Sequence, residues 1–391
     1  MTAIVELVGL TVAVIASGFM AWAIGAGSSG STPFAPAVGA RAISVLRAGL
    51  LVGIFGLLGA VLQGGSITTT IGRDLIGGAP LGVEGATIAL TIAAVLVAIG
   101  VFAGYPIATA FTVTGAVVGV GLGLGGTPQP SVYAVIGAVW LATPFVGAGA
   151  AFLIARLLRR SGRTEQRTVA ALGGIVTMII AHARFGPAGE ITVIGFLQTV
   201  TPPPITPAAA AIGWTTLVGT AGVVLVRQTL RHDPDRGERW FLLILGVLVA
   251  FSAGASQVGL AIGPLVPVMT AGGGVPFSLL LVGGGVGLLI GSWTGAPRLI
   301  KALARDYSSL GPRRSIAAMI PAFAIAQLAV GIGVPVSFNE IIVSAIIGSG
   351  LSVDRAAVSR RKILRTALAW IGSLLLAVLI GYALAAGLSL L

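Results

Sequence analysis

Two glycine-rich segments carry many of the polar side chains that could do chemistry in this otherwise apolar chain. These side chains are Ser28, Ser29 and Thr32 in the first segment, and Ser256 and Gln257 in the second, within residues 251–266. Each segment interrupts an apolar run, and irregular backbone at membrane depth is tolerated only where it is buried in protein or lines a cavity. We therefore interpret the two interruptions as candidate halves of one binding site.

Two proline-led segments add further hydrogen-bond donors. Pro106 and Pro335 are predicted to begin helices, because proline is well tolerated where its missing N–H would have had no partner. Thr109 and Ser337 would then lie in first helical turns, with Asn339 close to Ser337. Unpaired N–H groups and the helix dipole favour an anion at such a place. The polar set is typical of an oxyanion site, although the same hydroxyls could instead satisfy helix backbone or permit close packing.

Glu340 is a carboxylate inside a predicted membrane segment, three residues after Ser337. An ionisable residue at that depth is a functional candidate by default. Proton coupling is the natural role, since protonation would relieve repulsion between this carboxylate and a bound anion. The alternative is a charge that merely benefits from the dipole at a helix N-terminus.

The composition indicates a polytopic membrane protein. Hydrophobic residues make up 56% of 391 positions, charged residues 9%, and the mean hydropathy is +1.05. Apolar runs of about 20 residues, enough to cross a bilayer, recur along the whole chain. The net charge of +12 comes from arginines in short loops, which indicates cytoplasmic loops in a lipid bilayer rather than a nucleic-acid partner.

Several kinds of chemistry are excluded or disfavoured by the residues present. The chain has no cysteine, which removes disulfides and thiolate sites. Its two histidines, His182 and His232, make a histidine-based metal site improbable. The glycine runs lack the Lys and Ser/Thr of a nucleotide-binding loop. We therefore expect neither an enzyme nor a cofactor.

An internal repeat organises the chain. Residues 26–36 can be laid on 254–264, which places Ser28 on Ser256, and residues 106–119 on 335–348. The loop after the second helix is nearly neutral in the first copy and basic in the second, so the copies face opposite ways. Inverted repeats with corresponding broken helices are the signature of secondary transporters. A structural symmetry left by gene duplication, without transport, is the alternative.

The predicted fold is an all-α polytopic membrane protein with about twelve transmembrane helices in two inverted repeats that contain broken or re-entrant helices. Residues 1–160 form the first repeat, residues 161–239 two connecting helices with basic loops, and residues 240–391 the second repeat. Both termini are expected outside, because the arginine-rich loops belong inside.

The chain also resembles the inorganic phosphate transporters of the PiT type. Their Gly-Ala-Asn-Asp-Val-Ala-Asn-Ala motif is similar to residues 254–261, Gly-Ala-Ser-Gln-Val-Gly-Leu-Ala, and their Pro-Val-Ser-Thr-Thr-His to the segments that begin at Pro106 and Pro335. The resemblance implies a homodimer that imports phosphate with a coupling cation. In this chain Ser29 and Gln257 stand where the motif has aspartate, which removes the obvious cation ligands and also negative charge near the anion.

We therefore expect a multi-pass secondary transporter of inorganic phosphate in the cytoplasmic membrane, coupled to H⁺ or Na⁺. A permease for sulfate or another oxyanion is the alternative, since hydroxyl and N–H donors do not distinguish tetrahedral anions. A non-transporting membrane subunit of a larger complex is a third possibility, favoured if the two breaks pack together without a cavity.

Overall fold

The computed structural model describes residues 2–78, 81–159, 163–186, 190–202, 204–271, 274–305, 310–353 and 360–390. Within these residues the protein is almost entirely helical. Two short antiparallel strands, β1 (Ile76–Gly77) and β2 (Thr127–Pro128), pair with each other at one end of the first half.

The first half consists of a broken helix, a long helix with a short extension, a helical hairpin and a final long helix. These elements are α1 (Thr2–Ile24), which continues into a π-helical turn (Gly25–Ser29), α2 (Ala35–Gly39), α3 (Val45–Gln63), α4 (Gly65–Thr69), a second π-helical turn (Thr70–Asp74), α5 (Val83–Ala103), α6 (Thr109–Gly123) and α7 (Pro130–Leu157).

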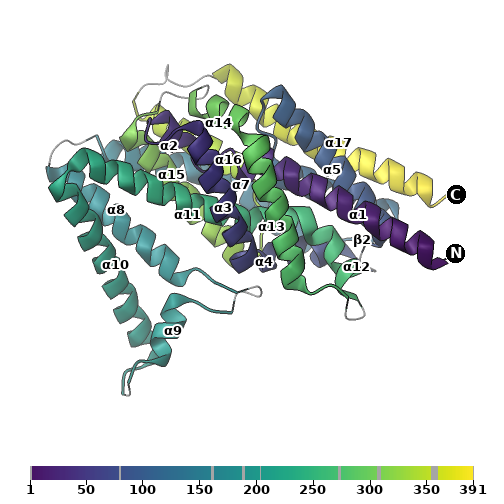
Figure 1. The fold of residues 1–391 in the computed structure, drawn as a ribbon, viewed down its shortest axis with the longest axis horizontal. Coiled ribbons are helices and arrows are strands. Elements are labelled where there is room, and N and C mark those ends of the chain that lie inside the picture. Colours follow the sequence, from purple (N-terminus) through teal and green to yellow (C-terminus); the bar gives the residue numbers. More distant parts are fainter. Residues whose placement is uncertain are drawn as a thin grey trace.

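The second half repeats this order. Its elements are α11 (Pro234–Ile262), a 3₁₀ turn (Gly263–Leu265), α12 (Val266–Thr270), α13 (Phe277–Thr294), α14 (Ala296–Arg305), α15 (Pro312–Ile332), α16 (Phe338–Leu351) and α17 (Arg360–Leu388). Between the halves lie α8 (Arg163–His182), α9 (Val193–Thr199) and α10 (Pro207–His232), which diverge from the main body at the lower left of Figure 1.

The two halves run in opposite directions. In Figure 1 the N-terminus of α1 and the C-terminus of α17 lie at the same end of the molecule, whereas α11 starts at the opposite end. Among the described residues, nine helices are long and apolar enough to cross a membrane, and α6 and α16 are shorter apolar helices of 15 and 14 residues. A crossing needs about 20 residues, so α6 and α16 are too short to cross a bilayer by themselves. The expected all-α polytopic fold is confirmed.

Glycines set the distance between the halves. A Cβ at Gly254 of α11 would overlap the carbonyl oxygen of Gly56 in α3, and a Cβ at Gly25 would overlap that of Leu288 in α13. Small residues allow this backbone approach in membrane bundles, where lipid gives helices little hydrophobic reason to associate. Gly25 and Gly254 therefore occupy equivalent places in the two repeats.

The predicted interruption over residues 251–266 is largely wrong. α11 is a regular helix through Ile262, and the helix breaks only at Gly263–Leu265. Glycines within α11 serve close packing instead of ending the helix, as the contact of Gly254 with α3 shows. The break predicted in the first half is confirmed, because the backbone leaves α-helical geometry at Gly25.

The predicted helix starts at the two prolines are also wrong by about one turn. α6 begins at Thr109 and α16 at Phe338, and the residues between each proline and its helix carry no helical structure. The preceding helices end on left-handed glycines, Gly104 with φ 73° and Gly333 with φ 69°. The chain must reverse there, and a residue before proline is kept out of the helical region, so an extended linker precedes each short helix.

The glycine contact predicts a sharp difference between two otherwise similar substitutions. We expect Gly254→Val to lower the thermal unfolding temperature in detergent, with an overpacking cost of about 1–3 kcal/mol. Gly213→Val on α10 is the matched control, because a Cβ there meets no atom within 4 Å. Equal melting temperatures for the two variants would contradict the proposed role of glycine contacts between α3 and α11.

Candidate functional site

The side-chain amide of Gln257 lies at the centre of a buried network that joins the two halves. Its Oε1 accepts hydrogen bonds from the hydroxyl of Thr109 at 2.7 Å and from that of Ser28 at 3.3 Å. Its Nε2 donates to the carbonyl of Val336 at 2.8 Å and to Ser256 Oγ at 3.3 Å. The four polar side chains are fully buried. Four of the predicted site residues are thus brought together.

Ser28 and Gln257 are equivalent residues of the two repeats. They are 229 positions apart, the same offset that separates Gly25 from Gly254 and Gly104 from Gly333. The structure therefore pairs Ser28 with Gln257, whereas the sequence alignment of the repeats paired Ser28 with Ser256, one residue earlier. Equivalent residues can touch each other only close to the axis that relates the halves, so this contact marks where the pseudo-two-fold axis passes.

The N-cap and the first turn of α16 contain three buried polar atoms without a hydrogen-bond partner. They are Ser337 Oγ, Asn339 Oδ1 and Glu340 Oε2. Buried polar atoms are nearly always hydrogen-bonded, so each such exception calls for an explanation. The first N–H groups of a helix also lack partners within the helix. This turn thus combines N–H donors with a hydroxyl, an amide oxygen and a carboxyl group.

Asn339 also holds the two halves together. Its Nδ2 donates to the carbonyl of Gly27 at 2.8 Å, in the π-helical turn, and to that of Ile107 at 2.6 Å, in the α5–α6 linker. One side chain of the second half therefore satisfies two carbonyl groups of the first.

Ser29 and Thr32 make local contacts. The hydroxyl of Ser29 donates to the carbonyl of Ile24 at 3.5 Å, and that of Thr32 to the carbonyl of Ser28 at 2.9 Å. Both satisfy the backbone of the first break, which is the alternative weighed from the sequence. Their assignment as substrate ligands stays a prediction.

Two tryptophans outside the predicted site hold the linkers in front of α6 and α16. Trp140 of α7 donates its indole N–H to the carbonyl of Pro335 at 2.7 Å, and Trp370 of α17 donates to that of Pro106 at 2.7 Å. Each linker is thus fixed by the last long helix of the other half. A buried indole N–H usually needs a partner, and the matching positions of the two tryptophans in the repeat were a usable signal.

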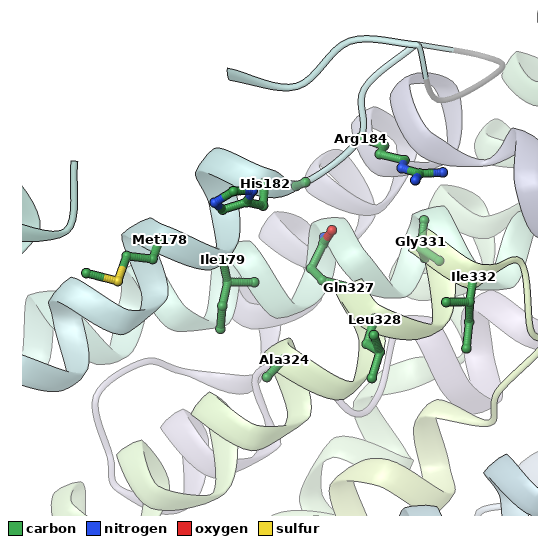
Figure 2. A pocket seen from close by; sticks show the side chains of 11 residues that line it. Met178, Ile179, His182, Arg184, Ala324, Gln327, Leu328, Gly331 and Ile332 are labelled. Atoms are coloured by element: carbon green, nitrogen blue, oxygen red, sulfur yellow. The ribbon is translucent and has the colours of Figure 1, made fainter. Parts of the chain in front are cut away.

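A pocket of about 500 Å³ lies between α8 and α15. Figure 2 shows Gln327 of α15 in its interior, with His182 and Arg184 at the C-terminal end of α8. His182 and Arg184 are exposed, whereas Gln327 is buried. The lining is mainly apolar apart from these three side chains.

Gln327 connects this pocket to the helix that carries Gln257. Its Nε2 donates to Ser252 Oγ at 2.7 Å and to Gln63 Oε1 at 3.1 Å. Ser252 lies one helical turn before Ser256 on α11, so both face the same side. In the first half the positions equivalent to Gln327 and Ser252 are alanines. The polar connection is therefore one-sided, and an uncharged amide within an apolar span was the signal for it.

The bridging role of Asn339 predicts a loss of stability on its removal. Asn339→Leu leaves the carbonyls of Gly27 and Ile107 without this donor, and each unsatisfied buried group costs about 1–3 kcal/mol. We expect a lower unfolding temperature in detergent. Ser349→Ala is the control, because that buried hydroxyl bonds only within α16, to the carbonyl of Ile346. A melting temperature unchanged by Asn339→Leu would show that the bridge contributes nothing.

Comparison with known proteins agrees with the resemblance seen in the sequence. The profile of the phosphate transporter family matches residues 24–381. One similar protein is the "putative phosphate permease" of Pyrococcus horikoshii, which is 28% identical over 379 residues that cover 90% of each chain. Another is the "putative phosphate permease" of Chlamydia trachomatis, which is 26% identical over an alignment of 407 residues that covers 92% of this chain and 94% of the relative.

A solved structure described as "The sodium-dependent phosphate transporter" has the same fold. It matches with a TM-score of 0.80 and 22% sequence identity, over 98% of this chain and 100% of that one. The family and this structural relative are transporters and not enzymes. Because the family profile covers most of its length, this chain belongs to the phosphate transporter family.

Proposed function

We propose that this protein is a secondary transporter that binds inorganic phosphate where its two halves cross and carries it across the cytoplasmic membrane. The observation that carries the proposal is the fully buried polar cluster around Gln257, with three unpartnered polar atoms in the adjacent first turn of α16. Polar groups inside a membrane bundle are costly and are typical of a substrate site.

The chemistry of the cluster suits a tetrahedral oxyanion. The hydroxyls of Ser28, Thr109 and Ser337 can donate to phosphate oxygens, and so can Gln257 Nε2 and the first-turn N–H groups of α6 and α16. No aspartate stands at residues 28, 29 or 257, so a dianion meets less repulsion there. Sulfate offers similar oxygens and is the alternative substrate.

Phosphate binding must open the contact between the halves. The hydroxyls of Ser28 and Thr109 now bond to Gln257, so an anion would take over these donors. Rocking of one repeat against the other around a fixed midplane site is the usual basis of alternating access. Direct contact of the two breaks is also what a non-transporting subunit would show, but the family of this chain consists of transporters.

We place one route to the site at the pocket between α8 and α15. Arg184 and His182 lie at its rim, and Gln327 and Ser252 lead from its interior towards Ser256. A cation at a pocket mouth raises the local concentration of anions. The predicted topology puts this end of α8 outside, because its arginine-rich start belongs inside.

Coupling to a cation is part of the proposal, and Glu340 is its candidate group. A proton carried on this carboxyl group would cancel one negative charge beside the bound anion. Sodium is the second candidate, since the similar solved structure is described as sodium-dependent. Among the described residues no three His, Cys, Asp or Glu side chains gather, so sodium would have to be held mainly by hydroxyl, amide and carbonyl oxygens. We also propose that the transporter acts as a homodimer.

Replacement of the central amide tests the site. We expect Gln257→Leu to reduce uptake of labelled phosphate into proteoliposomes by at least about tenfold, the equivalent of about 1.4 kcal/mol. Gln228→Leu, at an exposed position on α10, should leave uptake unchanged. The same assay with labelled sulfate compares the two substrates. Uptake by Gln257→Leu at the rate of the Gln228→Leu control would contradict the assignment of the site.

Replacement of the buried carboxylate tests the coupling. If protons are co-transported through Glu340, phosphate uptake should rise as the external pH falls, and Glu340→Gln should lose this dependence. The measurement is uptake across an imposed pH gradient, with and without sodium. A Glu340→Gln variant that keeps both its rate and its pH dependence would refute the role, and strict dependence on sodium would identify the other ion.

A further inference from the structure

The two connecting helices enclose a basic pocket far in sequence from the transport site. This pocket has a volume of about 320 Å³ and is lined by Gln166 and Arg167 of α8 and by Arg227 and Arg231 of α10. Arg227 and Arg231 are four residues apart, which places them on one face of α10. Three guanidinium groups from two helices therefore share one small space.

The carboxylates nearest along the chain have other partners. Glu165 is paired with Arg313, whose Nη2 donates to its Oε2 at 2.6 Å. Asp233 accepts from the backbone N–H of Arg236 at 3.0 Å and so caps α11. No carboxylate lines the pocket among the described residues, and residues 160–164, Arg-Ser-Gly-Arg-Thr, contain no acid in the sequence.

An anion would relieve this concentration of like charge. Like charges repel more strongly near a protein surface than in bulk water. Guanidinium groups also match the geometry of phosphate oxygens with paired N–H donors. The pocket therefore has the charge and the donors for a phosphate group.

The position of the pocket indicates where that phosphate group comes from. It lies at the arginine-rich ends of α8 and α10, which belong to the cytoplasmic surface. Further along α10, Leu217, Val224 and Leu225 are exposed apolar side chains against which acyl chains can lie. Basic pockets between helices on this side of a membrane bind anionic headgroups.

We propose that Arg167, Arg227 and Arg231 form a phosphate-group site that is occupied by the headgroup of an anionic phospholipid. The bound lipid bridges α8 and α10 and so holds together the connection between the two repeats. Inorganic phosphate shares the same chemistry and is the other source of the group. The site uses none of the residues assigned to transport.

The test compares two triple variants of the full chain by native mass spectrometry. Arg167→Gln/Arg227→Gln/Arg231→Gln removes the site, and Arg47→Gln/Arg361→Gln/Arg365→Gln removes three exposed arginines elsewhere. We expect wild type and the control to retain phosphatidylglycerol in preference to phosphatidylcholine, and the first variant to lose this preference at least tenfold. The single variant Arg231→Gln should show a smaller loss, and it replaces the triple variant if that does not fold.

A second measurement distinguishes the two sources. Binding of labelled inorganic phosphate is measured in lipid-free detergent. If wild type binds phosphate, the first variant does not, and neither prefers a phospholipid, the phosphate-group site is supported. Its occupant is then inorganic phosphate and not a lipid. The proposal is overturned if wild type and the folded first variant retain both ligands equally, or if wild type shows neither a phospholipid preference nor phosphate binding.

Discussion

The hydrogen bond between Ser28 and Gln257 joins the two repeats inside the buried polar cluster. These residues are equivalent in the two repeats, so the bond lies close to the axis that relates the halves. The hydroxyl of Thr109 donates to the same amide oxygen of Gln257, and the carbonyl of Val336 accepts from the amide nitrogen. Any motion of one repeat against the other must change this contact.

Close backbone packing and hydrogen bonds from two tryptophans, each to the opposite half, make that contact possible. Gly25 and Gly254 allow the broken helices to approach α13 and α3 without side chains between them. Trp140 and Trp370 then hold the linkers in front of α16 and α6 from the opposite half. Because each half supplies the support for the other's short helix, neither repeat completes a site alone. The N–H groups of two short helices are thereby fixed beside a polar cluster inside an apolar bundle.

The sequence predicted the membrane class, the repeat and most of the central cluster, because charge and apolar runs have strong local signals. It misplaced the register by one residue, since Ser28 and Ser29 are both serines and either could be paired with Gln257. The equivalent glycine pairs of the structure show that Ser28 is the partner. It predicted a break over residues 251–266 where α11 mostly continues, because glycine both ends helices and permits close packing. An uncharged amide in an apolar span marks Gln63 and Gln327 in the sequence, but no local pattern predicts that they bond to each other across distant segments.

We propose that phosphate occupies the crossing point of the two halves. A structure determined by electron cryomicroscopy with phosphate present tests it most directly. We predict density for a tetrahedral anion between the first turns of α6 and α16, within hydrogen-bond distance of Thr109 and Ser337, with the bond between Ser28 and Gln257 opened. Phosphate density at another place, with the bond between Ser28 and Gln257 intact, would contradict the account.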